Sequence, residues 1–90
     1  MIEKLKTYLQ ITWDDPQIDA RLNVLLEESE TAIDGLIGRN LNYNKDLQAR
    51  ELLFSRVRYA YNNAIEIFAE NFAAEILRLQ LTEGVKKDEE

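Results

Sequence analysis

The chain has 90 residues, which is enough for one domain with a modest hydrophobic core. It contains no cysteine and no histidine, which excludes disulfides, thiolate metal sites and the commonest general base and zinc ligand. The formal net charge of −6 argues against general binding to duplex DNA, which needs many phosphate contacts.

Acidic and basic residues are unevenly distributed along the chain. Residues 1–38 contain 8 acids and 3 bases, residues 39–58 contain 2 acids and 5 bases, and residues 59–90 contain 7 acids and 3 bases. The basic middle consists of Arg39, Lys45, Arg50, Arg56 and Arg58. We interpret it as a solvated face, and contact with an acidic protein neighbour is the alternative.

The sequence also lacks the features of a membrane protein. No apolar run reaches the ~20 residues of a membrane span, and the charged, amphipathic N-terminus is not typical of a signal peptide. We therefore expect a soluble protein made in the cytoplasm, with no membrane partner.

Two helices are predicted in the first half of the chain, over residues 2–10 and 15–37. The second has one apolar stripe at helical spacing, formed by Ile18, Leu22, Leu25, Leu26, Ser29, Ala32, Ile33, Leu36 and Ile37. Gly38 suits the end of this helix. The asparagine-rich segment NLNYNKDLQ that follows predicts a loop.

An aspartate and a proline mark the start of the second helix. Pro16 suits the first helical position, and Asp15 before it suits the N-cap. A metal site formed by Asp14, Asp15 and Asp19 is the alternative interpretation. Capping is favoured, because no further ligands are in view.

Two more helices are predicted, over residues 46–69 and 72–82. The third helix has a core stripe of Leu53, Phe54, Val57, Ala60, Tyr61, Ala64, Ile65 and Phe68, which Phe72 extends. A nucleic-acid stacking platform would instead place aromatic residues beside lysine and arginine, whereas Glu66 and Glu70 follow the aromatics here. The aromatic run therefore indicates packing.

The fold class predicted is all-α, a small bundle of about four helices with a long central helix pair and an exposed apolar C-terminal helix. Residues 1–83 form the single domain, and residues 84–90 form a flexible tail with acidic and basic residues. We expect the two central helices to pack through Phe54, Val57, Tyr61, Ile65 and Phe68 on one side and Leu22, Leu25, Ser29, Ile33 and Leu36 on the other.

Two features exceed what such a core requires. A mixed stripe on the third helix lies away from the core stripe, and FAAEILRLQL at residues 72–81 is apolar almost all round a helix. Exposed apolar surface of this kind suggests protein–protein contact. The predicted contact residues are Leu52, Arg56, Tyr59, Asn63, Ile67, Ile76, Leu77 and Leu81.

Catalysis would have to depend on carboxylates. All-helical enzymes that hold magnesium place acidic clusters on facing helices, and the nearest approach here is Glu27, Glu30 and Asp34 with Glu66 and Glu70. Most of these residues lie away from the apolar faces, so a solvated acidic face is favoured. The sequence has no phosphate-binding loop motif. We predict no catalytic, cofactor-binding or metal-binding residues, and hence a protein that is not an enzyme.

Four motifs follow one another along the chain: LKTYLQITWDDPQID at residues 5–19, AIDGLIG at 32–38, RVRYAYNNAIEIFAENF at 56–72 and EILRLQL at 75–81. In this order they cover essentially the whole chain, and they resemble the small head–tail connector (adaptor) proteins of tailed bacteriophages. Pro16 departs from the family pattern, where an acid or small polar residue is common.

The resemblance implies a structural protein of the virion, located at the head–tail junction. Its partners would be further copies of itself in a ring, the phage portal protein, and a tail-completion or stopper protein. DNA would pass through the ring without specific binding. The rival interpretations are a small helical DNA-binding module of the small-terminase or regulatory type, for which only Arg50, Arg56 and Arg58 are candidates, and a generic helical interaction module.

Overall fold

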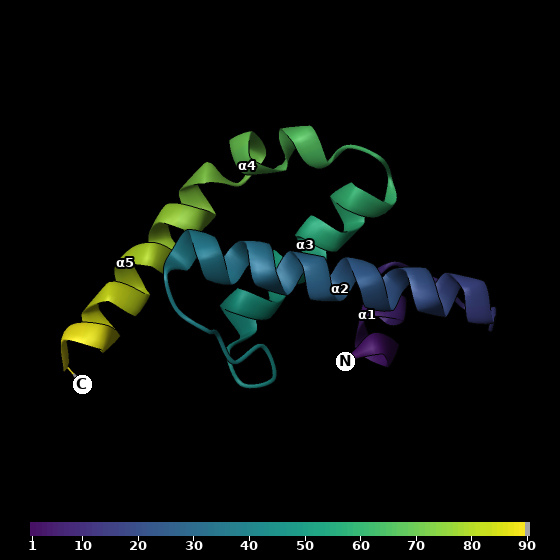
Figure 1. The fold of residues 1–90 in the computed structure, drawn as a ribbon, viewed down its shortest axis with the longest axis horizontal. Helices are drawn as coiled ribbons and strands as arrows, with labels where there is room; N and C mark the ends of the chain where they lie inside the picture. Colours follow the sequence, from purple (N-terminus) through teal and green to yellow (C-terminus); the bar gives the residue numbers. More distant parts are fainter. Residues whose placement is uncertain (90) are drawn as a thin grey trace.

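The structure, a computed structural model, describes the backbone of residues 1–89 and the side chains of residues 1–84. Helices joined by turns and loops make up this part of the chain, and it contains no strand, which confirms the all-α class (Figure 1). Five α-helices occur in it rather than the predicted four. They are α1 (Ile2–Tyr8), α2 (Pro16–Ile37), α3 (Leu47–Tyr61), α4 (Phe68–Asn71) and α5 (Ala73–Glu89), with a 3-10 turn η1 (Ile65–Ile67) before α4.

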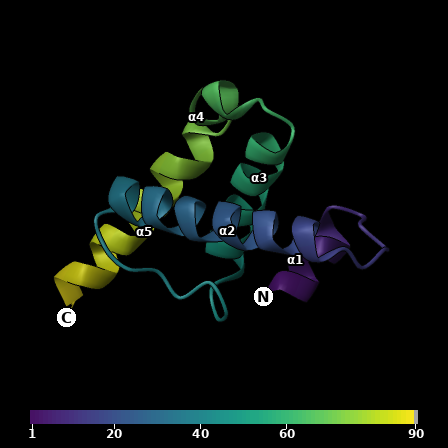
Figure 2. The same ribbon diagram turned by 45° about the vertical axis from the view of Figure 1, so that its right-hand side comes forward.

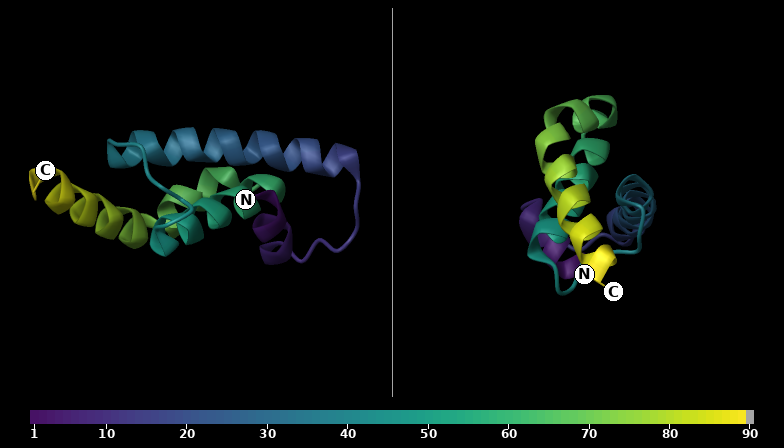
Figure 3. Two further views of the ribbon diagram at one scale, coloured as in Figure 1. Left: turned by 90° about the horizontal axis from the view of Figure 1, so that it is seen from below. Right: turned by 90° about the vertical axis from the view of Figure 1, so that its left-hand side faces the viewer.

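The crossing of α2 and α3 forms the centre of the molecule. Figure 3 shows α2 along one side, with α1, α3 and α5 on the other. Leu22 and Ile33 of α2 and Leu53 and Val57 of α3 have no exposed surface, so the predicted stripes do form the core. Ser29 is equally buried, and its hydroxyl accepts a hydrogen bond of 2.9 Å from Arg56 Nη1.

The start of α2 follows the predicted capping pattern. Asp15 has an extended backbone, and its Oδ1 accepts a hydrogen bond of 2.9 Å from the Gln17 amide, with Pro16 as the first helical residue. The other two aspartates hold a lysine. Lys6 Nζ of α1 lies 3.3 Å from Asp14 Oδ1 and 3.1 Å from Asp19 Oδ1. These aspartates therefore fasten α1 to the start of α2.

The loop between α2 and α3 is held by one carboxylate. Gly38 ends α2 with a φ of 89°, a conformation that favours glycine. Asp34 Oδ1 then accepts hydrogen bonds from the Tyr43 hydroxyl at 2.8 Å and from the Leu41 amide at 3.1 Å. Tyr43 is buried, so the loop returns to the body of the molecule before α3 begins at its N-cap Asp46.

The predicted third helix, over residues 46–69, is wrong in its second half because α3 ends at Tyr61. Asn63 takes a left-handed conformation with a φ of 58°. The Ala64 amide donates to Tyr59 O at 2.7 Å and the Asn63 amide donates to Ala60 O at 3.1 Å. This is the paired hydrogen-bond pattern of a Schellman cap. Its left-handed position is usually occupied by glycine and sometimes by asparagine.

Residues 62–72 reverse the chain between α3 and α5, and we call them the hairpin connection (Figure 2). Its reversal explains one error in the predicted core, since Ile65 no longer belongs to α3 and is 36% exposed. A second predicted core residue, Leu36 near the C-terminal end of α2, is 47% exposed. Tyr61 and Leu25 are half-buried. Phe68 is buried as predicted, but it reaches the core because the hairpin connection folds back towards α3.

The last helix is longer than predicted, since α5 reaches Glu89 and not residue 82. The described backbone is elongated, with extents of 44 × 26 × 18 Å, and α5 projects past the end of α2 (Figures 1 and 3). Residues 84–89 of the predicted tail are thus helical in backbone. The side chains of residues 85–90 and the backbone of residue 90 lie outside the described residues.

Candidate subunit-contact surface

One side of α5 is packed and the other is exposed. Ile76 and Leu79 are buried, and Gln80 Nε2 donates 2.9 Å to the Leu36 carbonyl at the end of α2. Leu77 and Leu81, one turn apart, are 55% and 63% exposed. With the exposed Ala73 and Ala74 they form a continuous apolar surface, which we call the α5 ridge. A ridge of this kind is typical of a contact with another chain.

A groove runs between α3 and α5. It has a volume of about 250 Å³, with apolar side chains below and charged side chains at the rim. Its lining residues are Gln48, Glu51, Leu52, Ser55, Phe72, Glu75, Arg78 and Leu79. We call it the α3–α5 groove. The sequence did not predict it, because it exists only where the hairpin connection turns α5 back alongside α3.

The predicted contact residues are only partly brought together. Leu77 and Leu81 lie side by side on the ridge, and Ile67 is 43% exposed on η1. Leu52 and Ile76 belong to the buried core, at 5% and 8% exposure. The expectation that these two lie outside the core is wrong, because the hairpin connection brings α5 back against α2 and α3.

The polar members of the predicted set also have roles within the chain. Arg56 is half-buried and hydrogen-bonded to Ser29, and Asn63 forms the turn that ends α3. Tyr59 is half-buried, and its hydroxyl accepts a hydrogen bond of 3.1 Å from Asn71 Nδ2. The Asn63 turn and the Asn71–Tyr59 hydrogen bond stabilise the hairpin connection, whereas Arg56 joins α3 to α2 through Ser29. The exposed apolar members of the predicted set are therefore Leu77, Leu81 and Ile67.

The aromatic run packs within the molecule as predicted. The Tyr59 ring meets Phe68 and Phe72 edge-on at centroid distances of 5.8 and 5.5 Å, and the two phenylalanines stack at 5.0 Å. Edge-to-face and offset-stacked pairs at these distances are the favoured aromatic arrangements. The cluster closes the hairpin connection against α3.

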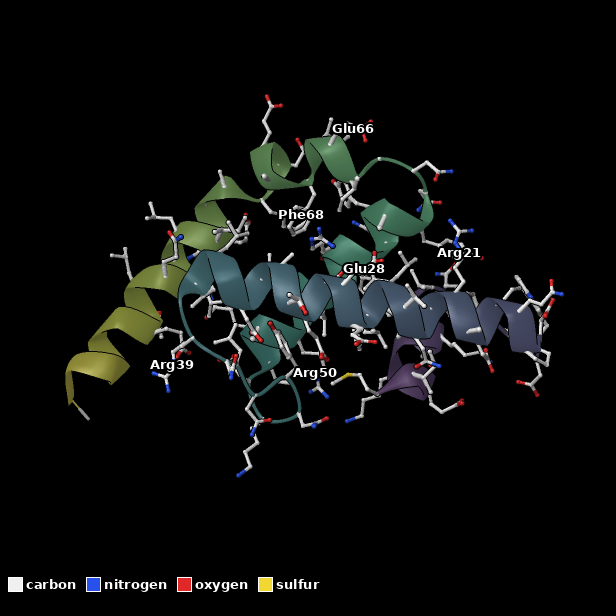
Figure 4. All side chains as sticks on the ribbon, viewed as in Figure 1. Arg21, Glu28, Arg39, Arg50, Glu66 and Phe68 are labelled. Carbon is white, nitrogen blue, oxygen red and sulfur yellow. The ribbon has the colours of Figure 1, made fainter. Side chains whose placement is uncertain are left out.

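Among the described side chains, the basic residues do not form one face. Figure 4 shows Arg21, Arg39 and Arg50 at separate places along the molecule. Arg39 Nε lies 3.4 Å from Glu83 Oε2 of α5, and the Arg58 guanidinium lies 5.7 Å from the centres of two tyrosine rings. Burial lowers the pKa of Arg56, which faces inward. The described side chains therefore form no continuous basic surface for duplex DNA.

The acidic residues are equally dispersed. Glu66 lies on the hairpin connection, far from Glu28 on α2, and Asp34 is engaged by Tyr43 and Leu41 (Figure 4). Burial raises the pKa of Glu30, and the neighbouring carboxylates of Asp34 and Glu27 raise it further. Within the described residues, no group of three or more acidic side chains is placed to hold a metal ion.

A second hollow lies where the α2–α3 loop meets α5. It has a volume of about 630 Å³ and is wide open, with Leu47 at its edge 65% exposed. Its lining is mixed: Arg39, Asn40, Leu41, Asn42, Lys45, Asp46, Leu47, Gln48, Thr82 and Glu83. The hollow has no convergent set of catalytic groups.

No helix in the described part of the chain is long and apolar enough to cross a bilayer. Comparisons of the chain with models of protein families, with curated proteins and with solved structures found no match. The α5 ridge and the α3–α5 groove are the candidate contact surfaces of the described residues.

Proposed function

We propose that the chain is a structural subunit of a phage head–tail connector, which forms a ring beneath the portal and offers a docking surface to a tail or stopper protein. The observation that carries the proposal is the α5 ridge, where two leucines remain more than half exposed on a helix that is packed on its other side. Contiguous exposed apolar surface of this kind suggests contact with another protein. The ordered motifs described above support the choice of this family.

The charge of the chain is compatible with a DNA conduit. A channel wall with net negative charge avoids the phosphate contacts that would hold a sliding polyanion. The formal net charge of −6 has this sign. The rival DNA-binding function is disfavoured, because Arg56 is half-buried and donates to the Ser29 hydroxyl, which leaves only Arg50 and Arg58 of its three candidates.

The test is assembly with the portal protein encoded in the same genome. Native mass spectrometry of the mixture should show several copies of this chain on the portal. Leu77→Asp should abolish this complex, because a charge would be buried unpaired at the contact. Thr82→Asp is the matched control, since it places the same charge on the same helix away from the ridge.

The purified wild-type chain also distinguishes the connector function from the rival DNA-binding function. The wild-type chain should show no binding to duplex DNA at low salt, where phosphate contacts are strongest. Binding to DNA without association with the portal would contradict the connector proposal and favour the packaging module.

A further inference from the structure

We propose that the α5 ridge of one copy inserts into the α3–α5 groove of a second copy, so that the chain associates with itself head to tail. The inference rests on the ring assembly in the proposed function, and it assigns the two faces that would meet in such a ring. The occupant of the groove is thus a second copy of this chain.

The ridge and the groove lie on opposite sides of the same helix. At 100° per residue, the ridge pair Leu77 and Leu81 is displaced by about 160° around α5 from the groove pair Glu75 and Leu79. A ridge cannot reach the groove of its own chain from there. The same helix therefore offers one surface to each of two neighbours.

The two surfaces match in chemistry. The ridge has leucines spaced by about 6 Å along the helix. The groove floor has Leu52, Phe72 and Leu79, which are buried or half-buried. Rows of side chains on one helix commonly pack between the side chains of its neighbours in this way.

Charge complementarity favours a copy of this chain as the occupant. Glu51 and Glu75 give the groove an acidic rim, and Arg78 stands on the margin between groove and ridge. Among the side chains that the structure describes, no ion pair engages any of these three residues. An incoming ridge brings its own Arg78 towards the Glu51 and Glu75 carboxylates of the next copy.

The symmetry of the contact follows from this placement. A contact between two different faces is heterologous, so every copy uses both faces and the chain of contacts closes into a ring when the rotation permits. A two-fold dimer through ridge against ridge would leave both grooves empty. The ridge-to-groove and ridge-to-ridge contacts therefore predict different association when a variant with an altered ridge is mixed with a variant with an altered groove.

The experiment uses two variants of the full chain. The ridge variant is Leu77→Asp with Leu81→Asp, and the groove variant is Glu51→Trp, which places a large ring across the groove at an exposed position. Circular dichroism checks that both are folded. If Glu51→Trp lowers the helical signal, Glu75→Trp at the other side of the groove replaces it.

Sedimentation velocity over a concentration series gives the readout. The wild-type chain should associate beyond the dimer, and each variant alone should weaken self-association about tenfold or more. An equimolar mixture of the two variants should form a heterodimer and stop there, because one intact ridge meets one intact groove.

Three results would overturn the proposal: a wild-type chain that stays monomeric at every concentration, variants that associate like wild type, or a mixture that forms no heterodimer. A wild-type dimer that the ridge variant abolishes and the mixture does not restore would indicate ridge against ridge. The portal experiment is independent. A portal complex that forms normally with the groove variant Glu51→Trp would keep the connector function and remove this contact, and self-association without portal binding would do the reverse.

Discussion

The α2–α3 crossing and the hairpin connection are both built from apolar residues at helical spacing, yet only the crossing follows that spacing as a continuous helix. At the crossing, Leu22 and Ile33 meet Leu53 and Val57 without exposed surface. In the hairpin connection the same spacing continues through Phe68, but Asn63 ends the helix. The difference shows that apolar periodicity does not identify where a helix ends, since Phe68 is buried in the same stripe although it lies beyond the end of α3.

Phe68→Ala should have the largest effect, and it tests whether the hairpin connection unfolds together with the crossing. The ring is 3% exposed and contacts Tyr59 and Phe72, so its loss should lower the free energy of unfolding by about 3–5 kcal/mol. Urea unfolding followed by circular dichroism measures it. Leu53→Ala at the crossing is the reference, with an expected loss of about 2–5 kcal/mol.

A loss below about 1 kcal/mol for Phe68→Ala, beside a full loss for Leu53→Ala, would contradict this expectation. The hairpin connection would then open separately from the crossing. Ile67→Ala, at a neighbouring exposed position, should leave the unfolding midpoint nearly unchanged in either case.

Tyr43→Phe should have the next largest effect. It compares the α2–α3 loop, which hydrogen bonds hold, with the hairpin connection, which aromatic rings hold. The change removes the hydroxyl donor of Asp34 Oδ1, and a hydrogen bond to a charged group contributes about 1.5–3 kcal/mol. Burial raises the pKa of Tyr43, and its hydrogen bond to Asp34 raises that pKa further. The Tyr43 hydroxyl therefore remains protonated and donates across the neutral range.

The matched control is Tyr61→Phe. Tyr61 contacts the Arg21 guanidinium through the face of its ring, at 4.8 Å from the centroid, so removal of its hydroxyl should cost less than about 0.5 kcal/mol. Equal losses for the two tyrosines in thermal or urea unfolding would show that Asp34 does not hold the loop.

Asn63→Ala probes the turn that separates the two regions. A residue with a Cβ pays about 1–2 kcal/mol in the left-handed conformation, and asparagine tolerates it better than alanine. We expect Asn63→Ala to lower stability by about 1 kcal/mol and Asn63→Gly to be neutral or slightly stabilising. An alanine variant as stable as the glycine variant would mean that the turn does not require a positive φ.

Glu30→Gln should have the smallest effect, and its sign depends on pH. The pKa of Glu30 is raised by burial and then by Asp34 and Glu27, so the folded state binds more protons than the unfolded state above the ordinary value of about 4.3. Stability due to this group therefore falls as pH rises through that window. The neutral amide should raise the unfolding midpoint slightly at pH 7 and lose this advantage near pH 4.

Glu3→Gln is the control for Glu30→Gln, because it removes one negative charge from an exposed position on α1. A pH profile of Glu30→Gln parallel to that of the wild-type chain would contradict the expectation. The comparison is best made by thermal unfolding at several pH values.

Much of the fold could be predicted from the sequence because its signals are local. Asp15 and Pro16 start α2, Gly38 ends it, and the two apolar stripes define the crossing. The end of α3 could not be predicted from periodicity, since the stripe continues past it. The signal for the end of the helix was the pair of adjacent asparagines, Asn62 and Asn63, because asparagine sometimes replaces glycine at the left-handed position of a helix cap.

The candidate contact surface was predicted in one part and missed in another. Leu77 and Leu81 follow from the excess of apolar residues on the last helix, which is a property of the sequence alone. The α3–α5 groove depends on how two helices lie after a reversal of the chain, which residue types do not encode directly. For the same reason the sequence pattern places Leu52 and Ile76 on the surface, whereas the packing of α5 against α2 and α3 buries both.

The pair of aspartates around Lys6 has a consequence for chemical reactivity. Acylating reagents attack the neutral amine, and the hydrogen bond to Asp19 raises the pKa of Lys6, so less of that form is present. Its side chain is also only 6% exposed, whereas Lys4 and Lys45 lie open to solvent. A brief treatment with an amine-reactive ester should modify those two lysines and spare Lys6 until α1 detaches. Mass spectrometry of that one lysine would therefore report on whether the N-terminal helix is docked.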